Sequence, residues 1–225
     1  MYAPLIALLA FLSGVAAVAR RRRRTRRLPA HAVIVSPRQS TVVQRDGAVR
    51  SVQTAKLTLE AADLERLWTP GNLENLARTY WRFLSRVTLK LIRVVYTEDS
   101  RLVVFLVRPL TLLRFDVPEY TIESDHGTVR WPIRDGLLVA RTGRGCGFLA
   151  LDVRREPARP DGKEDLLIEV EVANFYPSIA VGFSTPVYEM TQSAVHVLVT
   201  HAFLRSLAKL DLAQSKIGVL ASRRT

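Results

Sequence analysis

The segment VTLKLIRVVYTEDSRLVVFLVR, residues 87–108, decides the fold of this chain. β-Branched and aromatic residues dominate both sides of Glu98-Asp99-Ser100, a triplet typical of a turn. The pattern predicts two antiparallel strands, residues 87–97 and 101–108, joined as a hairpin. We therefore expect an antiparallel sheet as the framework.

Six further strand-like segments follow the hairpin. Turn signals at Asp125-His126-Gly127 and Asp135-Gly136, and a polar loop at 157–163, separate several of them. Their hydrophobic pattern predicts a continuous series of antiparallel strands. The predicted strands are residues 110–116, 120–124, 128–133, 137–142, 145–155 and 164–173.

One strand and two helices are predicted before the hairpin. Residues 48–59 alternate between apolar and polar, as a half-buried strand does, and residues 60–68 form a short helix. Thr69 and Pro70 are a plausible N-cap and first-turn pair for a second helix. That helix places Leu73, Leu76, Ala77, Tyr80 and Leu84 on one apolar face.

The series of strands ends in a long helix. Pro186 precedes an uninterrupted helical pattern over residues 187–212. The order is a strand, two short helices, a set of antiparallel strands and one long helix. Over residues 46–212 this order resembles the helix-grip fold of the SRPBCC superfamily, which includes START-like lipid-transfer domains, pollen-allergen-like proteins and polyketide cyclases. The resemblance rests on the order and length of the elements, without a signature motif.

The resemblance implies an α+β fold with a curved antiparallel sheet of about seven strands around the C-terminal helix. It also implies an apolar cavity between sheet and helix. Members of the superfamily mostly bind hydrophobic ligands, and some catalyse cyclisation or dehydration. No residue-level motif is carried over, so the catalytic residues stay unassigned.

The N-terminus predicts a membrane anchor. Residues 2–19 carry no charge and would span about 27 Å as a helix, close to the thickness of a bilayer core. The arginines that follow place the rest of the chain in the cytoplasm and the N-terminus outside the cell membrane. A secretory signal peptide is the alternative, because Ala17-Val18-Ala19 fits a cleavage site. It lacks a basic region before the apolar segment, and the arginines would resist translocation.

The arginine block contributes seven of the 33 lysines and arginines of a chain with net charge +12. We expect it to set the topology and to bind anionic lipid headgroups, worth about 1 kcal/mol per side chain. Nucleic-acid binding is the alternative, and the adjoining apolar segment disfavours it. The block consists of Arg20, Arg21, Arg22, Arg23, Arg24, Arg26 and Arg27.

The domain organisation follows from these segments. Residues 1–19 are the transmembrane anchor, 20–45 the basic flank and linker, 46–212 the helix-grip domain and 213–225 a C-terminal tail. Pro29 and Pro37 are the linker signals.

The candidates for a ligand cavity lie on the long helix and on two strands. His201, Leu198 and Ala194 fall on or near the helix face expected to meet the sheet. Tyr120 and Trp131 are the strand candidates. A core histidine hydrogen-bonded to a backbone carbonyl is the alternative interpretation of His201.

Other motifs point away from cofactor chemistry. His196 and His201 are five residues apart, so they do not form a metal pair on one helix face. A single cysteine, Cys146, excludes an internal disulfide framework. The glycines at 143–147 are interpreted as a strand connection, since no helix follows them. Glu119 and Glu123 share a strand face, either as a buried acid–base pair or on an exposed surface. We expect no metal and no cofactor.

The sequence therefore predicts a single-pass membrane protein whose cytoplasmic domain binds a hydrophobic or lipid-like small molecule. The bilayer and its anionic headgroups are the other expected partners. One alternative is a cyclase- or dehydratase-like enzyme that uses His201 or a strand carboxylate. The other is a non-catalytic, membrane-tethered scaffold.

Overall fold

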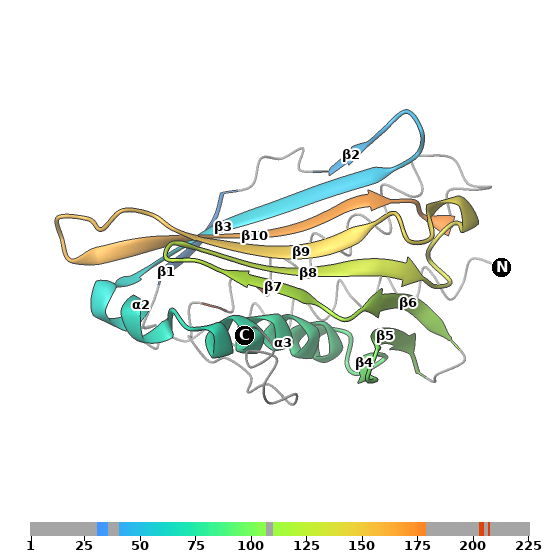
Figure 1. Ribbon diagram of the computed structural model, residues 1–225, viewed down its shortest axis with the longest axis horizontal. Helices are drawn as coiled ribbons and strands as arrows, with labels where there is room; N and C mark the ends of the chain where they lie inside the picture. Colours follow the sequence, from blue (N-terminus) through green and yellow to red (C-terminus); the bar gives the residue numbers. More distant parts are fainter. Residues whose placement is uncertain (1–30, 36–40, 107–109, 179–202, 205–206, 208–225) are drawn as a thin grey trace.

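Two helices lie against one face of an antiparallel sheet (Figure 1). The computed structural model describes residues 31–35, 41–106, 110–178, 203, 204 and 207. Within these residues ten strands form one sheet in the order β1-β3-β10-β9-β8-β6-β5-β4, with β2 beside β3 and β7 beside β8.

The strands and helices have these bounds. The strands are β1 (His31–Ile34), β2 (Thr41–Val43), β3 (Val49–Glu60), β4 (Ile92–Tyr96), β5 (Ser100–Phe105), β6 (Thr111–Asp116), β7 (Glu119–Ile122), β8 (His126–Asp135), β9 (Phe148–Arg155) and β10 (Lys163–Phe175). The helices are α2 (Ala61–Leu67) and α3 (Pro70–Val87), with a 3₁₀ turn η1 (Arg141–Gly143).

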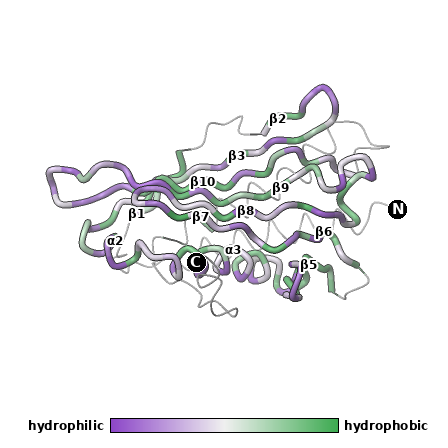
Figure 2. Tube along the Cα trace, in the orientation of Figure 1, coloured by the Kyte–Doolittle hydropathy of each residue, from purple (hydrophilic) through white to green (hydrophobic). Residues whose placement is uncertain are grey.

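The first long strand pairs with the last one. β3 and β10 are antiparallel neighbours from Glu60 opposite Lys163 to Val49 opposite Phe175. Buried residues alternate along β3 with partly or fully exposed ones. Ser51 and Gln53 are buried although they are polar, and Figure 2 shows hydrophilic and hydrophobic residues mixed along this strand. This pairing adds β3 to the meander β4 to β10. The antiparallel sheet with its two helices confirms the α+β class, and the described residues form ten strands where about seven were expected.

Helix α3 has the predicted start and the predicted apolar face. The Thr69 hydroxyl accepts a hydrogen bond from the Asn72 backbone N–H at 3.2 Å, and Pro70 opens the helix. Tyr80 and Trp81 are both buried on this helix. Trp81 packs on the sheet through Trp131, with ring centroids 5.3 Å apart. The helix is therefore fastened to the sheet by aromatic contacts.

The predicted C-terminal helix 187–212 lies almost wholly outside the described residues. Phe203 and Leu204 are helical and buried, and Leu207 is buried as well. The ring of Phe203 packs edge-on against Tyr80, with centroids 5.2 Å apart. At these three positions the C-terminal part belongs to the same hydrophobic core as the sheet.

Two of the predicted strands were wrong, one in its start and one altogether. The strand expected over 87–97 begins only at Ile92, because α3 continues through Val87. The Thr88 hydroxyl, which donates to the Leu84 carbonyl, also accepts from the Ile92 N–H and so joins the helix end to the strand. The strand expected over 137–142 is absent, since residues 141–143 form η1. In both places tertiary contacts outweigh local β-propensity.

The linker prediction also differs from the structure. His31–Ile34 and Thr41–Val43, within the segment expected to be a linker, form β1 and β2 along the outer edge of β3. The reason is the edge of β3 that does not face β10. Its backbone N–H and C=O groups would be unpaired there, and a further strand can hydrogen-bond to them. The residues 20–30 and 36–40 of that segment lie outside the described part.

The predicted anchor at residues 2–19 lies outside the described residues, as does the arginine block. None of the helices described in the structure is long and apolar enough to cross a bilayer.

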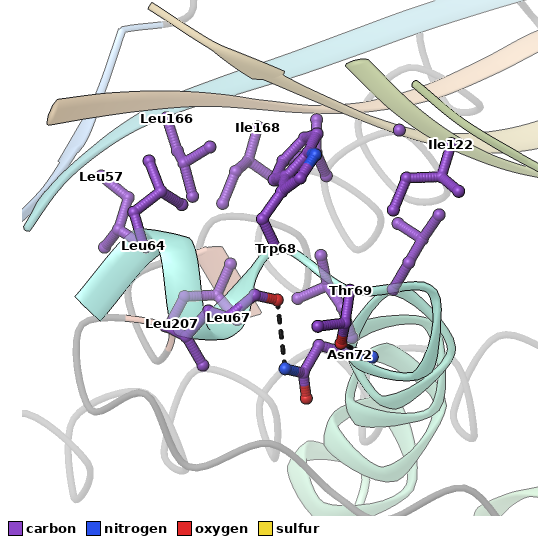
Figure 3. Close-up of a pocket in the computed structure, with 14 residues that line it drawn as sticks. Leu57, Leu64, Leu67, Trp68, Thr69, Asn72, Ile122, Leu166, Ile168 and Leu207 are labelled. Carbon is purple, nitrogen blue, oxygen red and sulfur yellow. Dashed lines mark hydrogen bonds between the residues drawn. The ribbon is translucent and has the colours of Figure 1, made fainter. Parts of the chain in front are cut away.

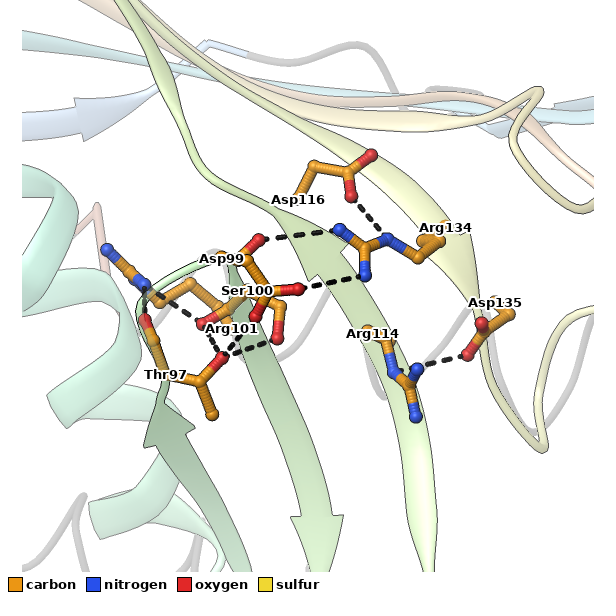
Figure 4. A network of polar contacts seen from close by, with 8 residues as sticks. All are labelled: Thr97, Asp99, Ser100, Arg101, Arg114, Asp116, Arg134 and Asp135. Atoms are coloured by element: carbon orange, nitrogen blue, oxygen red, sulfur yellow. Dashed lines mark hydrogen bonds and ion pairs between the residues drawn. The ribbon is translucent and has the colours of Figure 1, made fainter.

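A network of ion pairs links β8 to β6 and to the β4–β5 turn, where the ladder between β6 and β8 is short (Figure 4). β6 and β8 pair at only two positions, with an irregular register between them. The Arg134 guanidinium on β8 contacts Asp116 at 2.5 Å and Asp99 at 3.3 Å. Side chains thus support the part of the sheet that has the fewest backbone hydrogen bonds.

Gly143 tests the packing of the turn between β8 and β9. A Cβ at this position would lie 2.3 Å from the Cβ of Tyr176, whereas a Cβ at Gly71 on α3 would meet nothing within 4 Å. We expect Gly143→Ala to lower the free energy of unfolding by about 1–3 kcal/mol. Gly71→Ala should leave it unchanged or raise it by up to about 1 kcal/mol. Urea unfolding of both variants measures this, and equal stabilities would contradict the packing.

Asp165 gives a pH-dependent prediction for the β3–β10 pair. Burial pushes the pKa of Asp165 up, but hydrogen bonds from Thr58 at 2.5 Å and Lys56 at 3.2 Å outweigh it, so the pKa lies below its ordinary value of 3.8. A lowered pKa in the folded state stabilises the protein above the unfolded-state pKa, and this contribution is lost as the pH falls through the folded pKa. Asp165→Asn should therefore destabilise the chain at pH 7 and progressively less below about pH 4.

Thermal unfolding across this pH range is the measurement, with Glu98→Gln on the exposed β4–β5 turn as the matched control. If the stability loss for Asp165→Asn stays the same at pH 7 and well below pH 4, the pKa of Asp165 is not lowered in the folded chain.

Candidate functional site

An apolar pocket of about 80 Å³ lies between the sheet and the two helices (Figure 3). It is partly open to solvent. The sheet contributes Leu57, Ile122, Gly127, Val153, Leu166 and Ile168; the helices and the link between them contribute Leu64, Leu67, Trp68, Thr69, Asn72, Leu73 and Leu76; and the C-terminal part contributes Leu207.

The floor of the pocket follows from the strand register. Leu57 on β3 lies directly opposite Leu166 on β10, and Ile168 is two residues further along the same face. All three side chains are buried. The alternation of both strands therefore builds one continuous apolar surface beneath α2 and α3.

Gly127 leaves part of the space open. It is the first inward position of β8, and a Cβ built there would lie 3.4 Å from Cδ2 of Leu73 on α3. That distance is an ordinary van der Waals contact, so the missing side chain leaves volume in front of Leu73. Glycine at this position therefore leaves room for about one methyl group between β8 and Leu73.

The polar side-chain atoms at the rim form hydrogen bonds with backbone groups. The Trp68 indole N–H donates to the Glu123 carbonyl at 3.0 Å, and the Asn72 amide donates to the Leu67 carbonyl at 3.1 Å. The Thr69 hydroxyl caps α3. None of the described lining residues has a titratable side chain. This lining can hold an apolar group, and it offers no general acid or base.

A charged group outside the pocket supports Trp68. The Arg155 guanidinium lies 5.6 Å from the Trp68 ring centroid, within cation–π range. Arg155 also pairs with Glu164 at 2.9 Å and with Glu65 on α2. These contacts tie the indole to β9, β10 and α2.

The structure places the two strand candidates outside the lining. Tyr120 shares a face of β7 with Ile122, so it lies beyond one end of the pocket. Burial, with a further contribution from the negative charge of Glu74, raises the pKa of Tyr120, so its hydroxyl stays protonated at neutral pH. Trp131 is only 2% exposed and packs in the aromatic core. The helix candidates His201, Leu198 and Ala194 lie outside the described residues.

A buried polar cluster next to Tyr120 was missed from the sequence. The guanidinium groups of Arg78 and Arg101 lie 5.4 and 5.0 Å from the ring centroid of Tyr96. Arg101 is 3% exposed and donates to the Thr97 and Ser100 carbonyls at 2.8 and 2.9 Å. No spacing in the sequence marks these residues, because α3, β4 and β5 meet only in the tertiary fold.

The remaining sequence candidates are surface groups. Glu119 and Glu123 are exposed, which agrees with the surface interpretation of this pair. His126 Nε2 lies 2.6 Å from Asp152 and 3.1 Å from the Thr128 hydroxyl. Both partners meet the same ring nitrogen, so the three groups do not form a nucleophile–base–acid relay, which needs both nitrogens. No metal-binding group of side chains occurs among the described residues.

Comparison with known proteins gives structural likeness only. No protein-family model matches this chain, and no curated protein matches it. Similar solved structures include an Arthrobacter aurescens protein studied by NMR, with 14% identity over 69% of this chain and 83% of that one, at a TM-score of 0.32.

Two human structures are similar as well. STARD10 has 11% identity over 76% of this chain and 72% of its own, at a TM-score of 0.31. The lipid transfer and protein localization domain of StarD13 has 12% identity over 87% and 94%, at a TM-score of 0.27. All three TM-scores are below 0.5, so the fold assignment rests on the strand order of this chain.

The rim contact of Trp68 is open to a direct test. Trp68→Phe keeps an aromatic ring but removes the N–H that donates to Glu123. The free energy of unfolding should fall by about 1 kcal/mol, the net value of one hydrogen bond. Because the acceptor is a backbone carbonyl, Glu123→Ala should have no such effect. Urea unfolding distinguishes the two, and an unchanged stability of Trp68→Phe would mean that the indole N–H contributes nothing.

Proposed function

We propose that this chain binds a hydrophobic or lipid-like small molecule in the pocket between the sheet and helices α2 and α3. The apolar lining is the observation that carries the proposal. Leucine, isoleucine and valine side chains form most of it, and the polar atoms of Trp68 and Asn72 at its rim are already hydrogen-bonded. Apolar groups gain free energy by leaving water for such a surface, at about 25 cal/mol per Å².

The size of the pocket limits the part of the ligand that it receives. Sites for drug-sized molecules measure about 300–1,000 Å³. The pocket here has about 80 Å³, which suits a short apolar group and not a complete lipid. We therefore propose that it takes the apolar end of a larger molecule, whose remainder lies at the open side.

Binding is favoured over catalysis by the same lining. Cyclisation or dehydration needs a group that moves a proton, and the described lining residues include none. The cyclase-like alternative thus has no support from this pocket. The scaffold alternative becomes an outcome of the experiment below.

The proposed setting is the cytoplasmic face of the cell membrane. Residues 2–19 are the proposed single-pass anchor, with the N-terminus outside. The arginine block at residues 20–27 is proposed to contact anionic lipid headgroups. The length and charge of these segments support this arrangement.

The test is native mass spectrometry of the full chain, purified from its host in lipid nanodiscs, followed by solvent extraction. We expect a stoichiometric hydrophobic compound. Gly127→Val should reduce its occupancy at least about tenfold, because the added methyl groups occupy the space in front of Leu73. Thr121→Val adds the same side chain on the exposed face of β7 and should retain the compound.

Two results would contradict binding in this pocket. A folded chain that carries no compound, and whose melting temperature does not rise with added 1-hexanol, is not a carrier. That outcome would favour the membrane-tethered scaffold. Retention of the compound in both variants would place its binding site elsewhere in the chain.

A further inference from the structure

Half of the exposed large hydrophobic side chains described in the structure belong to one end of the sheet. Leu89 follows α3, Leu106 follows β5, Leu110 precedes β6 and Leu137 follows β8; we call these four residues the leucine tip. Their exposed fractions are 55%, 44%, 41% and 56% in that order. A cluster of exposed leucines is a departure from ordinary surface composition, in which such residues are scattered singly.

Backbone hydrogen bonds hold the leucine tip together. The Leu106 N–H donates to the Leu91 carbonyl at 2.8 Å, which joins the connection after α3 to the end of β5. The Phe105 N–H donates to the Leu110 carbonyl at 2.9 Å. The Leu137 N–H donates to the Thr111 carbonyl at 3.0 Å. Four separate segments therefore meet at this end, beside β4 and β5 in Figure 1.

Two of these leucines have a left-handed backbone conformation, which is typical of turns and not of strands. Leu89 and Leu106 have φ values of 50° and 61°, and Lys90 has 67°. Residues other than glycine adopt this left-handed region at a cost, and for a branched side chain the cost is larger. Leucine at such exposed positions is thus not explained by folding alone.

The charge around the leucine tip has one sign. Arg86, Lys90 and Arg93 are exposed beside it, and the sequence from residue 85 to residue 97 contains no acid. The nearest acid along the chain to Leu137 is Asp135, which pairs with Arg114 at 3.5 Å. Glu98 and Asp99 lie at the opposite end of the β4–β5 hairpin. The Arg93 guanidinium also donates a hydrogen bond to the Leu106 carbonyl. The leucine tip therefore lies beside exposed positive charge.

We propose that the leucine tip docks the folded domain on an anionic bilayer surface. Leu89, Leu106 and Leu110 would enter the boundary between headgroups and acyl chains, and Arg86, Lys90 and Arg93 would contact the anionic headgroups. The charge complementarity selects a membrane over a second copy of this chain, whose tip would bring like charges together. This contact is separate from residues 2–19 and from the ligand pocket, and it needs neither to be correct.

An environment-sensitive fluorophore on the tip tests the proposal in the full chain. Cys146 is the only cysteine, so a Cys146→Ser background allows a single label at Leu106→Cys. The matched control label is Val42→Cys on β2, which is 57% exposed and lies at the other edge of the sheet. Each labelled chain is reconstituted with phosphatidylcholine vesicles that contain or lack phosphatidylglycerol.

We expect the label at position 106 to brighten and shift to the blue on the anionic vesicles, and the label at 42 to remain as in water. Lys90→Glu should weaken docking at least about fivefold, the factor for one basic side chain at an anionic surface. Arg45→Glu, the same charge reversal on the exposed β2–β3 turn, should leave it unchanged.

Three results would overturn the proposal. The first is a label at 106 that reports water on anionic vesicles, while circular dichroism shows a folded chain. The second is an equal response on neutral and anionic vesicles or at position 42. The third is a response without vesicles that rises with protein concentration, which would identify a second copy of the chain as the occupant.

Discussion

The pairing of β3 with β10 is the constraint on which the rest of this structure depends. The two strands are more than 100 residues apart in sequence, yet their ladder runs from Glu60 opposite Lys163 to Val49 opposite Phe175. Within the meander β4 to β10 the paired strands are next to each other in the chain or, for β6 and β8, separated by one strand, whereas this pair joins the first long strand to the last one. Without it β3 would not belong to the sheet that α2 and α3 cover. Such a contact pays a large loop-closure entropy, and the inward leucines and isoleucines offset it.

The pocket is a consequence of how that surface is covered. α3 is fastened to the sheet by aromatic rings at its middle, where Trp81 meets Trp131. Towards its start, Gly127 on β8 provides no side chain to meet Leu73. Close packing at one place and a missing side chain at the other leave a space bounded by apolar groups. The same helix ends in the turn that exposes Leu89, so its two ends carry the two surfaces for which we propose a role.

Prediction from sequence succeeded where a signal is local. The alternation of residues 48–59 and the Thr69-Pro70 pair placed β3 and the start of α3 within a residue or two. It failed where tertiary contacts decide: Val87 joins the helix and not the hairpin, and residues 31–34 become an edge strand because β3 offers them an open edge. For the site, Tyr120 and Trp131 were sensible aromatic candidates, but the face and neighbours of each were set by strand register. No sequence motif distinguishes Leu57, Leu166 and Gly127 as pocket residues.

The sequence by itself determined the class of the fold, the positions of β3, α2 and α3 and the uneven distribution of charge, because period-two and period-3.6 patterns and turn residues act over a few positions. Only the tertiary structure decided which strands are neighbours, which apolar side chains enclose a space and which leucines stay at the surface. These depend on contacts between segments far apart in the chain, such as Leu57 with Leu166. A short-range pattern states that a residue is buried or exposed on its own element, and it does not state what that residue will meet.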